Sequence, residues 1–319
     1  LVMGESVFKP VNTYSMPEYP ELKVDCPPLL EMIHHAYSRN FTHIHTATPG
    51  LVGLAGLMIA KVLKKPLIST YHTAFPQYAK AMTGENVMED ATWLYMTWYY
   101  RQCDVVLVPS STFKEELADH GGNPNRIRLM PRGVDTDRFQ PGPSGFAKPN
   151  KEFTLLYVGR VSKEKNLDVL AEAFKLLNRP DLCLRIVGGG PYLEEMKTSL
   201  KGYHAEFTGY LEGDTLVKEY QNADLFVFPS TTDTFGNVIV EAHACGLPTL
   251  VTEIGGPAEN VTEGVNGSIV RGNDVHALKE GIAKLLDKKL LAKMGETARE
   301  KIRDVSFERA FEECWSLYA

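Results

Sequence analysis

Short apolar runs alternate with amphipathic segments along most of this 319-residue chain, and this alternation constrains the fold more than any other feature. In the second half, the runs FTLLYVG (153–159), LCLRIVGGG (182–190) and DLFVFPS (224–230) each lead into a segment of helical periodicity. Continuous apolar strands without polar alternation are typical of parallel strands covered by helices on both faces. The pattern therefore predicts an α/β protein built around parallel sheets.

The alternation is interrupted once, by a segment rich in proline and glycine at residues 139–152. Such a composition is typical of a linker, and a chain of this length can bury two cores. We therefore expect two α/β lobes with a cleft between them: residues 1–138, then 139–305, followed by a last helix at 306–319. The opening residues before Pro27 give no strand–glycine–helix unit and are expected to be irregular.

Bulk composition excludes some classes of protein. The formal net charge of −6 argues against a general nucleic-acid binder, which needs a basic face. No run of 18 apolar residues occurs, so no membrane-spanning helix is expected. The five cysteines lack the spacing of a zinc motif, which favours buried free thiols in a reducing compartment.

The segment GRVSKEKN (159–166) directly follows the first strand of the second lobe. Ligands of open α/β sheets collect at the carboxyl ends of strands. There, Gly159 allows a tight exit, and the paired cations Arg160 and Lys165 suit a diphosphate. The alternative is a solvated loop with two unrelated charges.

Two further strand ends carry weaker signals. In VGGGP (187–191), Gly188 and Gly189 would let a ligand approach the backbone, although a plain strand–helix turn explains them equally well. In FTGYL (207–211), Tyr210 could meet a base, but a core tyrosine beside a turn glycine is the simpler interpretation.

The segment PSTTDTFGNVIVEAHACGLP (229–248) places two acids on either side of a predicted helix start. Helix N-termini hold anions through free amides and the helix dipole, and Gly236 would let a phosphate or sugar reach those amides. Asp233 lies just outside the helix and Glu241 lies more than a turn inside. The two acids are therefore expected to serve different groups, a sugar hydroxyl and a ribose diol; an ordinary capped helix is the alternative.

In this order and spacing, the four segments resemble the donor lobe of GT-B-fold retaining glycosyltransferases of the large family four. The family's acid-x₇-acid motif usually begins with glutamate, whereas this chain has Asp233 there. The segments THIHTATPGLVGLAGL, STYHTAFPQY and MPRGVDTDRF resemble a subgroup of mannosyl- and sulfoquinovosyltransferases that act on lipid or polyprenol acceptors. The resemblance implies two Rossmann-like lobes, with the donor in the second.

The resemblance also implies roles for individual residues. Arg160 and Lys165 would neutralise the diphosphate, while Asp233 would bind sugar hydroxyls. His72, after the strand LISTYH, matches the family's cleft histidine near the anomeric centre; without the resemblance it would be interpreted as structural. The implied donor-binding residues are Gly159, Gly188, Gly189, Tyr210, Leu211, Phe235, Gly236, Asn237 and Glu241.

No metal or other cofactor is expected, and the co-substrate is a UDP- or GDP-sugar. Asp135-Thr136-Asp137 is a D-x-D, the metal-binding signature of a different glycosyltransferase fold. Here it lies in a GVD-x-x-x-F segment that the resembling family also has, so cation neutralisation is assigned to Arg160 and Lys165. Retention of anomeric configuration then needs positioning and electrostatics rather than a dedicated base.

We expect a metal-independent hexosyltransferase that moves a mannose- or glucose-type sugar to a lipid-linked or glycan acceptor. The alternatives are a nucleotide-sugar-binding fragment or non-catalytic partner, and a GT-B-fold epimerase or phosphorylase. The resemblance further implies that about 50–70 residues of an initial strand and glycine loop precede this sequence, and that the last helix returns to the first lobe.

The expected localisation is cytoplasmic, with peripheral contact at the inner membrane face as an open alternative. The aromatic segment WLYMTWYY (93–100) would serve that contact, although its helical spacing is more typical of a core.

Overall fold

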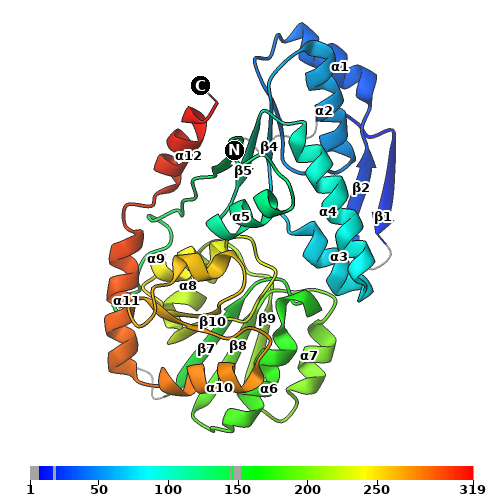
Figure 1. Cartoon of the computed structure of the whole chain (residues 1–319). Helices are drawn as coiled ribbons and strands as arrows, with labels where there is room; N and C mark the ends of the chain where they lie inside the picture. The colour runs from blue at the N-terminus through cyan, green and yellow to red at the C-terminus, as the bar shows by residue number, and fades with distance from the viewer. Residues whose placement is uncertain (1–6, 17–18, 144, 147–151, 319) are drawn as a thin grey trace. The chain divides into compact units, whose positions relative to one another are not determined.

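The computed structural model describes residues 7–16, 19–143, 145–146 and 152–318, which form two compact units (Figure 1). The first unit runs to Met130 and includes Tyr318, and the second runs from Pro131 to Leu317. The division thus falls ahead of residue 138, where the sequence placed the boundary. The return of the last helix to the first lobe stays a prediction.

The first unit begins with a β-hairpin where the sequence predicted irregular chain. Strand β1 (Asn12–Met16) pairs antiparallel with β2 (Tyr19–Cys26), and Thr13 lies opposite Asp25. The Thr13 hydroxyl donates to the Asp25 carboxylate at 2.6 Å. The proline and charged residues of YPELKVDC hide any apolar alternation, which explains why the pattern did not predict a strand.

Four parallel strands form the main sheet of this unit, in the order β3-β4-β5-β6. They are β3 (Ile44–Thr46), β4 (Leu67–Thr70), β5 (Val105–Val108) and β6 (Ile127–Leu129). The helices are α1 (Leu29–Ser38), α2 (Leu51–Leu63), α3 (Phe75–Thr83), α4 (Asn86–Arg101) and α5 (Ser111–Asp119). Helix α4 contains the aromatic segment 93–100, whose spacing predicted a helix. Tyr71, Met96 and Tyr99 are fully buried in the core between sheet and helices.

The second unit contains a six-stranded parallel sheet in the order β12-β11-β10-β7-β8-β9. The strands are β7 (Phe153–Val158), β8 (Leu182–Val187), β9 (Ala205–Gly209), β10 (Leu225–Phe228), β11 (Thr249–Thr252) and β12 (Gly267–Val270). The chain adds β8 and β9 on one side of β7 and then places β10 on the other side. The strand order therefore reverses between β7 and β10, and open α/β sheets bind ligands at such a switch point.

Helices cover this sheet, and its central strands are buried, as their continuous apolar sequences predicted. The second unit contains the helices α6 (Leu167–Leu177), α7 (Leu193–Ser199), α8 (Gly213–Asn222), α9 (Asn237–Ala244) and α10 (Val275–Lys284), and it ends with α11 (Lys288–Ile302) and α12 (Phe307–Ser316). Helix α6 packs against α10, and α9 packs against α11. Leu155, Ile186 and Phe226 are fully buried.

The charged region 276–304 forms two helices, although its amphipathic pattern is unbroken in the sequence. Helix α10 ends at Lys284 and α11 begins at Lys288. The Asp287 carboxylate accepts hydrogen bonds from the amides of Lys289 and Leu290, which caps the N-terminus of α11. The capping residue was present in the sequence but lay within an unbroken amphipathic pattern.

None of the five cysteines, all of which the structure describes, forms a disulfide; Cys103, Cys183 and Cys245 are buried as predicted, whereas Cys26 and Cys314 are half-buried. Among the residues that the structure describes, none of the helices combines the length and apolarity needed to cross a bilayer.

Candidate functional site

Two glycine turns interlock at the carboxyl ends of β7 and β8. Gly159 has φ 154° and Gly188 has φ 133°, values that favour glycine. A Cβ atom on Gly188 would lie 1.9 Å from the carbonyl oxygen of Gly159, so only glycine fits there. The backbone of the two loops therefore lies in direct contact at Gly159 and Gly188, and the approach of a ligand to Gly188 and Gly189 stays a prediction.

Lys165 spans the switch point. A 3₁₀ turn (Lys163–Lys165) follows β7 and directs Lys165 toward the loop after β10, where its Nζ donates to Asp233 Oδ2 at 2.7 Å. The side chains are 11% and 26% exposed, respectively, so solvent screens the pair only in part. The next residue, Asn166, donates to the Pro229 carbonyl at 3.3 Å and to Thr231 Oγ1 at 3.1 Å, which fixes the two loops against each other.

Asp233 also organises the start of α9. Its Oδ1 accepts a hydrogen bond from the Gly236 amide at 3.2 Å, and Gly236, with φ 81°, is the N-cap of the helix. The Gly236 amide, which the sequence assigned to the donor, is therefore engaged by Asp233 in this structure. Asn237, the first residue of the helix, is exposed.

Glu241 lies one turn into α9 and contacts a different group. The fully buried Tyr220 donates its hydroxyl to Glu241 Oε2 at 2.7 Å. Burial raises the pKa of the Glu241 carboxyl, and the Tyr220 hydrogen bond partly opposes that shift. Asp233 and Glu241 thus contact different groups of the protein, and their separate roles toward a sugar hydroxyl and a ribose stay predictions.

Tyr210 is exposed, which contradicts the alternative of a core tyrosine, while its contact with the donor stays a prediction. Its side chain is 73% accessible, and its hydroxyl donates to the Gly189 carbonyl at 2.9 Å. A Cβ on Gly189 would lie 2.6 Å from the Tyr210 ring, so this glycine lets the ring lie over the loop after β8. The exposed aromatic face is a suitable platform for a base. Leu211 packs partly against the core.

Arg132 is a cation near the site that sequence reasoning missed. Its guanidinium lies 5.4 Å from the centre of the Phe235 ring, in a cation–π contact. Burial lowers the Arg132 pKa, whereas nearby Cys314 and Asp233 act in the opposite direction. The available signal in the sequence was the position of Arg132 in MPRGVD, immediately before Gly133. That glycine is required by close packing, since a Cβ on it would lie 2.3 Å from the Ser306 carbonyl oxygen.

For two of the predicted site residues, Arg160 and His72, the structure gives the burial but no side-chain contact that bears on a donor. Arg160 is half-buried, and its carbonyl accepts the Tyr157 hydroxyl at 2.8 Å. His72 is half-buried two residues after β4, in the first unit. Direct contacts of either side chain with a donor stay predictions.

The D-x-D segment has a local structural role. The Asp135 carboxylate accepts from the Arg138 amide at 2.9 Å, and the Asp135 carbonyl accepts from the Phe139 amide at 2.9 Å. These bonds form a turn, and the absence of a metal role for this segment stays a prediction.

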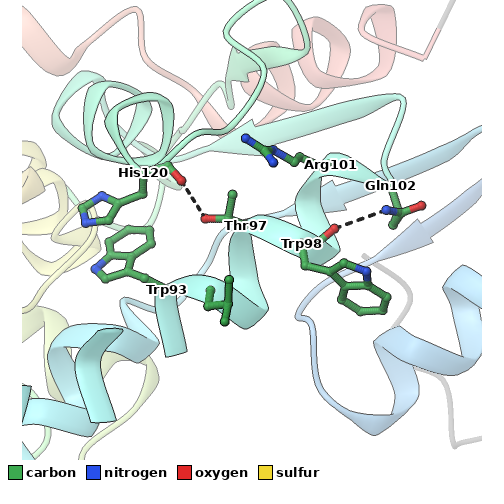
Figure 2. Close-up of a pocket in the computed structure, with 7 residues that line it drawn as sticks. Trp93, Thr97, Trp98, Arg101, Gln102 and His120 are labelled. Carbon is green, nitrogen blue, oxygen red and sulfur yellow. Dashed lines mark hydrogen bonds between the residues drawn. The ribbon is translucent and has the colours of Figure 1, made fainter. Parts of the chain in front are cut away.

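A separate cavity lies on the first unit at the C-terminal half of α4 (Figure 2). Its volume is about 490 Å³, and it is lined by Trp93, Leu94, Thr97, Trp98, Arg101, Gln102 and His120. The Trp93 and His120 rings stack with centres 3.8 Å apart. Aromatic and cationic side chains thus meet at a surface hollow that the donor-site prediction did not include.

A doubly wound sheet with glycine turns and a lysine–carboxylate pair at its switch point defines a class of α/β ligand-binding lobes. Residues 143–301 match the family described as Glycosyl transferases group 1, and residues 4–138 match Glycosyltransferase Family 4. The chain belongs to these glycosyltransferases, as the sequence motifs indicated.

Two curated relatives are similar over most of this chain. The GDP-mannose-dependent alpha-mannosyltransferase of Corynebacterium glutamicum is 33% identical over 97% of this chain and 74% of its own length. The sulfoquinovosyl transferase SQD2 of Arabidopsis thaliana is 31% identical over 84% of this chain. The chain covers 54% of that second relative, or about half its length.

Solved structures confirm the predicted GT-B fold. Sucrose-phosphate synthase from Thermosynechococcus elongatus matches with a TM-score of 0.81 and 24% identity, over 91% of this chain and 76% of that one. Anabaena HepE in complex with UDP-glucose matches with a TM-score of 0.79 and 19% identity, over 92% and 82%.

Proposed function

We propose that this protein is a retaining glycosyltransferase that transfers a hexose from a nucleotide-diphosphate sugar to a lipid-linked or glycan acceptor. The observation that carries the proposal is the Lys165–Asp233 pair at the switch point. A cation for the diphosphate and an acceptor for sugar hydroxyls meet there, which is what a sugar nucleotide requires of its site.

The pair also suggests how the donor is received. Without a donor, Lys165 and Asp233 neutralise each other. An incoming diphosphate competes for Lys165, and the released Asp233 carboxylate can then accept hydrogen bonds from the sugar. Lys165 and Arg160 together stabilise the charge that develops on the leaving phosphate, a role that needs no metal ion.

The donor to test first is GDP-mannose. Its support is the similarity to the mannosyltransferase of Corynebacterium glutamicum, whose name states that it depends on GDP-mannose. UDP-sugars are the second group, because UDP-glucose is bound in the HepE structure. Asp233, shorter by one methylene than the glutamate of the resembling family, is expected to adjust the choice of sugar.

The first unit supplies a surface suited to a lipid acceptor. Helix α4 carries an apolar stripe on its exposed side (Val87, Ala91, Leu94 and Trp98), in addition to its buried face. Near the end of the stripe lie two cations, Arg101 and Lys61; Lys61 Nζ donates to the Gln102 carbonyl at 3.3 Å. Apolar side chains beside cations favour an anionic bilayer surface, so we propose peripheral binding there.

Vesicle sedimentation tests the membrane contact. Wild type should bind vesicles containing phosphatidylglycerol more than vesicles of phosphatidylcholine alone, and the double variant Leu94→Ser/Trp98→Ser should lose most of that binding. Leu176→Ser, at a 49% exposed leucine of α6, is the matched control. Unchanged sedimentation of the double variant would contradict the proposal.

A transfer assay tests the activity. The chain is incubated with GDP-mannose or a UDP-hexose and with extracted lipids, and both nucleotide release and labelled lipid are measured. Acceptor-dependent release with a labelled product supports transfer. Binding without release indicates the non-catalytic alternative, and rearrangement of the donor without an acceptor indicates an epimerase.

A further inference from the structure

Cys183, His204 and Glu206 come together at the amino ends of β8 and β9, the opposite end of these strands from the switch-point loops. The Leu184 amide donates to the His204 carbonyl at 3.0 Å, which fixes the two strand ends side by side. One sulfur, one imidazole nitrogen and one carboxylate oxygen lie within 4.8 Å of one another. The sequence spacing of the cysteines gave no sign of this cluster.

Sulfur, imidazole and carboxylate are the ligand types that zinc prefers, at about 2.0–2.3 Å from the metal. The atoms would have to close in slightly on an ion, and two of the three side chains are free to do so. His204 and Glu206 are 45% and 44% exposed, whereas Cys183 is buried and fixed. A rigid thiol and two adjustable surface ligands therefore face one point.

The surroundings of His204 resemble the outer shell of a metal site. Its Nδ1 lies 3.0 Å from Glu152 Oε1, and its Nε2 lies 3.9 Å from Glu206 Oε1. A histidine that binds a metal through one ring nitrogen commonly donates the other N–H to a carboxylate, which fixes the ring. Glu152 would orient the ring in this way and leave Nε2 for the metal.

Glu206 is oriented in a similar way. Its Oε2 accepts from Arg185, and its Oε1 is the oxygen that faces His204. Arg185 also pairs with Glu219 at 3.0 Å, so the guanidinium is held between two carboxylates rather than over the cluster. In each of the two exposed ligands, one polar atom is thus bound by a neighbouring side chain and the other faces the cluster.

We propose that Cys183, His204 and Glu206 form a zinc-binding site that fastens the edge strand β9 to β8. Three protein ligands leave a fourth position for water. The site lies apart from the switch point and does not rest on the proposed transfer activity. It is compatible with a donor site that uses Arg160 and Lys165 in place of a metal.

Metal titration of the chelator-treated full chain tests the proposal. Calorimetry should show one equivalent of Zn²⁺ bound, and Co²⁺ should give a thiolate-to-cobalt charge-transfer band that Zn²⁺ abolishes. Cys183→Ala should remove the band, and His204→Gln or Glu206→Gln should weaken zinc binding at least tenfold. Cys26→Ala and His276→Gln, which change residues outside the cluster, should bind as wild type does.

Because Cys183 is buried, its variant is checked by circular dichroism, and the two variants of exposed residues carry the test if it misfolds. Zinc should also raise the melting temperature of wild type and not that of His204→Gln. A wild-type chain that gives no charge-transfer band overturns the proposal. Zinc affinity that is unchanged in both His204→Gln and Glu206→Gln overturns it equally.

Discussion

Lys165 and Asp233 meet at 2.7 Å across the point where the strand order of the second sheet reverses. One side chain follows β7 and the other follows β10, so the fold rather than local sequence brings them together. Each side chain neutralises the charge of the other until a ligand separates them. Replacing Lys165 and replacing Asp233 should therefore have different effects on ligand binding.

Replacing Lys165 should weaken donor binding and modestly lower stability. We expect Lys165→Ala to reduce GDP-mannose affinity about ten- to a hundredfold, since a charge-assisted hydrogen bond contributes about 1.5–3 kcal/mol. The unpaired Asp233 should cost about 1–2 kcal/mol of unfolding free energy, below the value for a fully buried pair because Gly236 and solvent still serve it. Calorimetry and urea unfolding measure the two effects.

Lys175→Ala is the matched control, because Lys175 pairs with Glu172 on α6 away from the site. Equal loss of donor affinity in both variants would contradict a specific role for Lys165.

Replacing Asp233 should have opposite effects on nucleotide and nucleotide sugar. In Asp233→Ala, Lys165 is no longer neutralised, so GDP should bind as tightly as in wild type or more tightly. The sugar loses its acceptor, so the gain in affinity from GDP to GDP-mannose should shrink about tenfold. Parallel titrations with the two ligands measure this difference. Equal weakening for both ligands would place Asp233 outside the sugar contact.

Because Gly188 packs directly against Gly159, replacing it with alanine should destabilise the fold through a steric clash in addition to backbone strain. Gly188 and Gly202 both have positive φ, but only at Gly188 would a Cβ meet a backbone oxygen. Gly202→Ala should cost about 1 kcal/mol of unfolding free energy from strain. Gly188→Ala should cost clearly more and should reduce nucleotide binding as well. Urea unfolding checks both; similar costs would argue against the close packing of the two loops.

These glycines also mark the limit of what sequence alone predicts. The strand ends, the loop GRVSKEKN and the helix start after Gly236 follow from apolar patterning and turn residues. The Lys165–Asp233 bond does not, because it depends on β10 crossing to the far side of β7. The exposure of Tyr210 does not follow from the sequence either, because burial of an aromatic side chain after a strand depends on its neighbours, and here Gly189 lets the ring lie outside the core. Arg132 was missed because the segment MPRGVD was used only for its resemblance to the family, and no role was assigned to the arginine before Gly133.

Tyr220→Phe should change the pH dependence of donor binding. The Tyr220 hydrogen bond lowers the pKa of Glu241, which burial raises. Without it, the carboxyl should protonate at higher pH, so a ribose contact through the carboxylate should be lost sooner on acidification. Affinity for GDP-mannose is measured from pH 8 to 5.5, with Tyr203→Phe, at a 41% exposed tyrosine, as the control. If wild type and Tyr220→Phe show the same dependence of affinity on pH, the result would contradict a contact between Glu241 and the donor.

His243 should make the protein less stable in acid. Burial lowers the pKa of His243 to about 3, and its Nε2 lies 3.1 Å from Thr249 Oγ1. The folded state disfavours the charged ring, so the neutral His243 ring makes its full contribution to the free energy of unfolding above the unfolded pKa of 6.5. As the pH falls toward 3, that contribution is lost, by up to about 1.4 kcal/mol per pH unit.

In wild type, the urea concentration at the unfolding midpoint should fall between pH 6.5 and 4, and in His243→Gln it should fall less steeply. His276→Gln, which changes an exposed residue, should behave as wild type does. An unchanged slope in His243→Gln would show that other groups dominate acid unfolding.

The central claim is that the switch point of the second unit binds a nucleotide-diphosphate sugar, and calorimetric titration tests it most directly. Wild type, Arg160→Ala and the control Arg179→Ala, an exposed arginine paired with Asp181, are titrated with UDP, GDP, UDP-glucose and GDP-mannose. We predict saturable binding of one nucleotide series, weakened at least tenfold by Arg160→Ala and unchanged by Arg179→Ala. Absence of binding to all four ligands, or equal binding by all three proteins, would contradict the account.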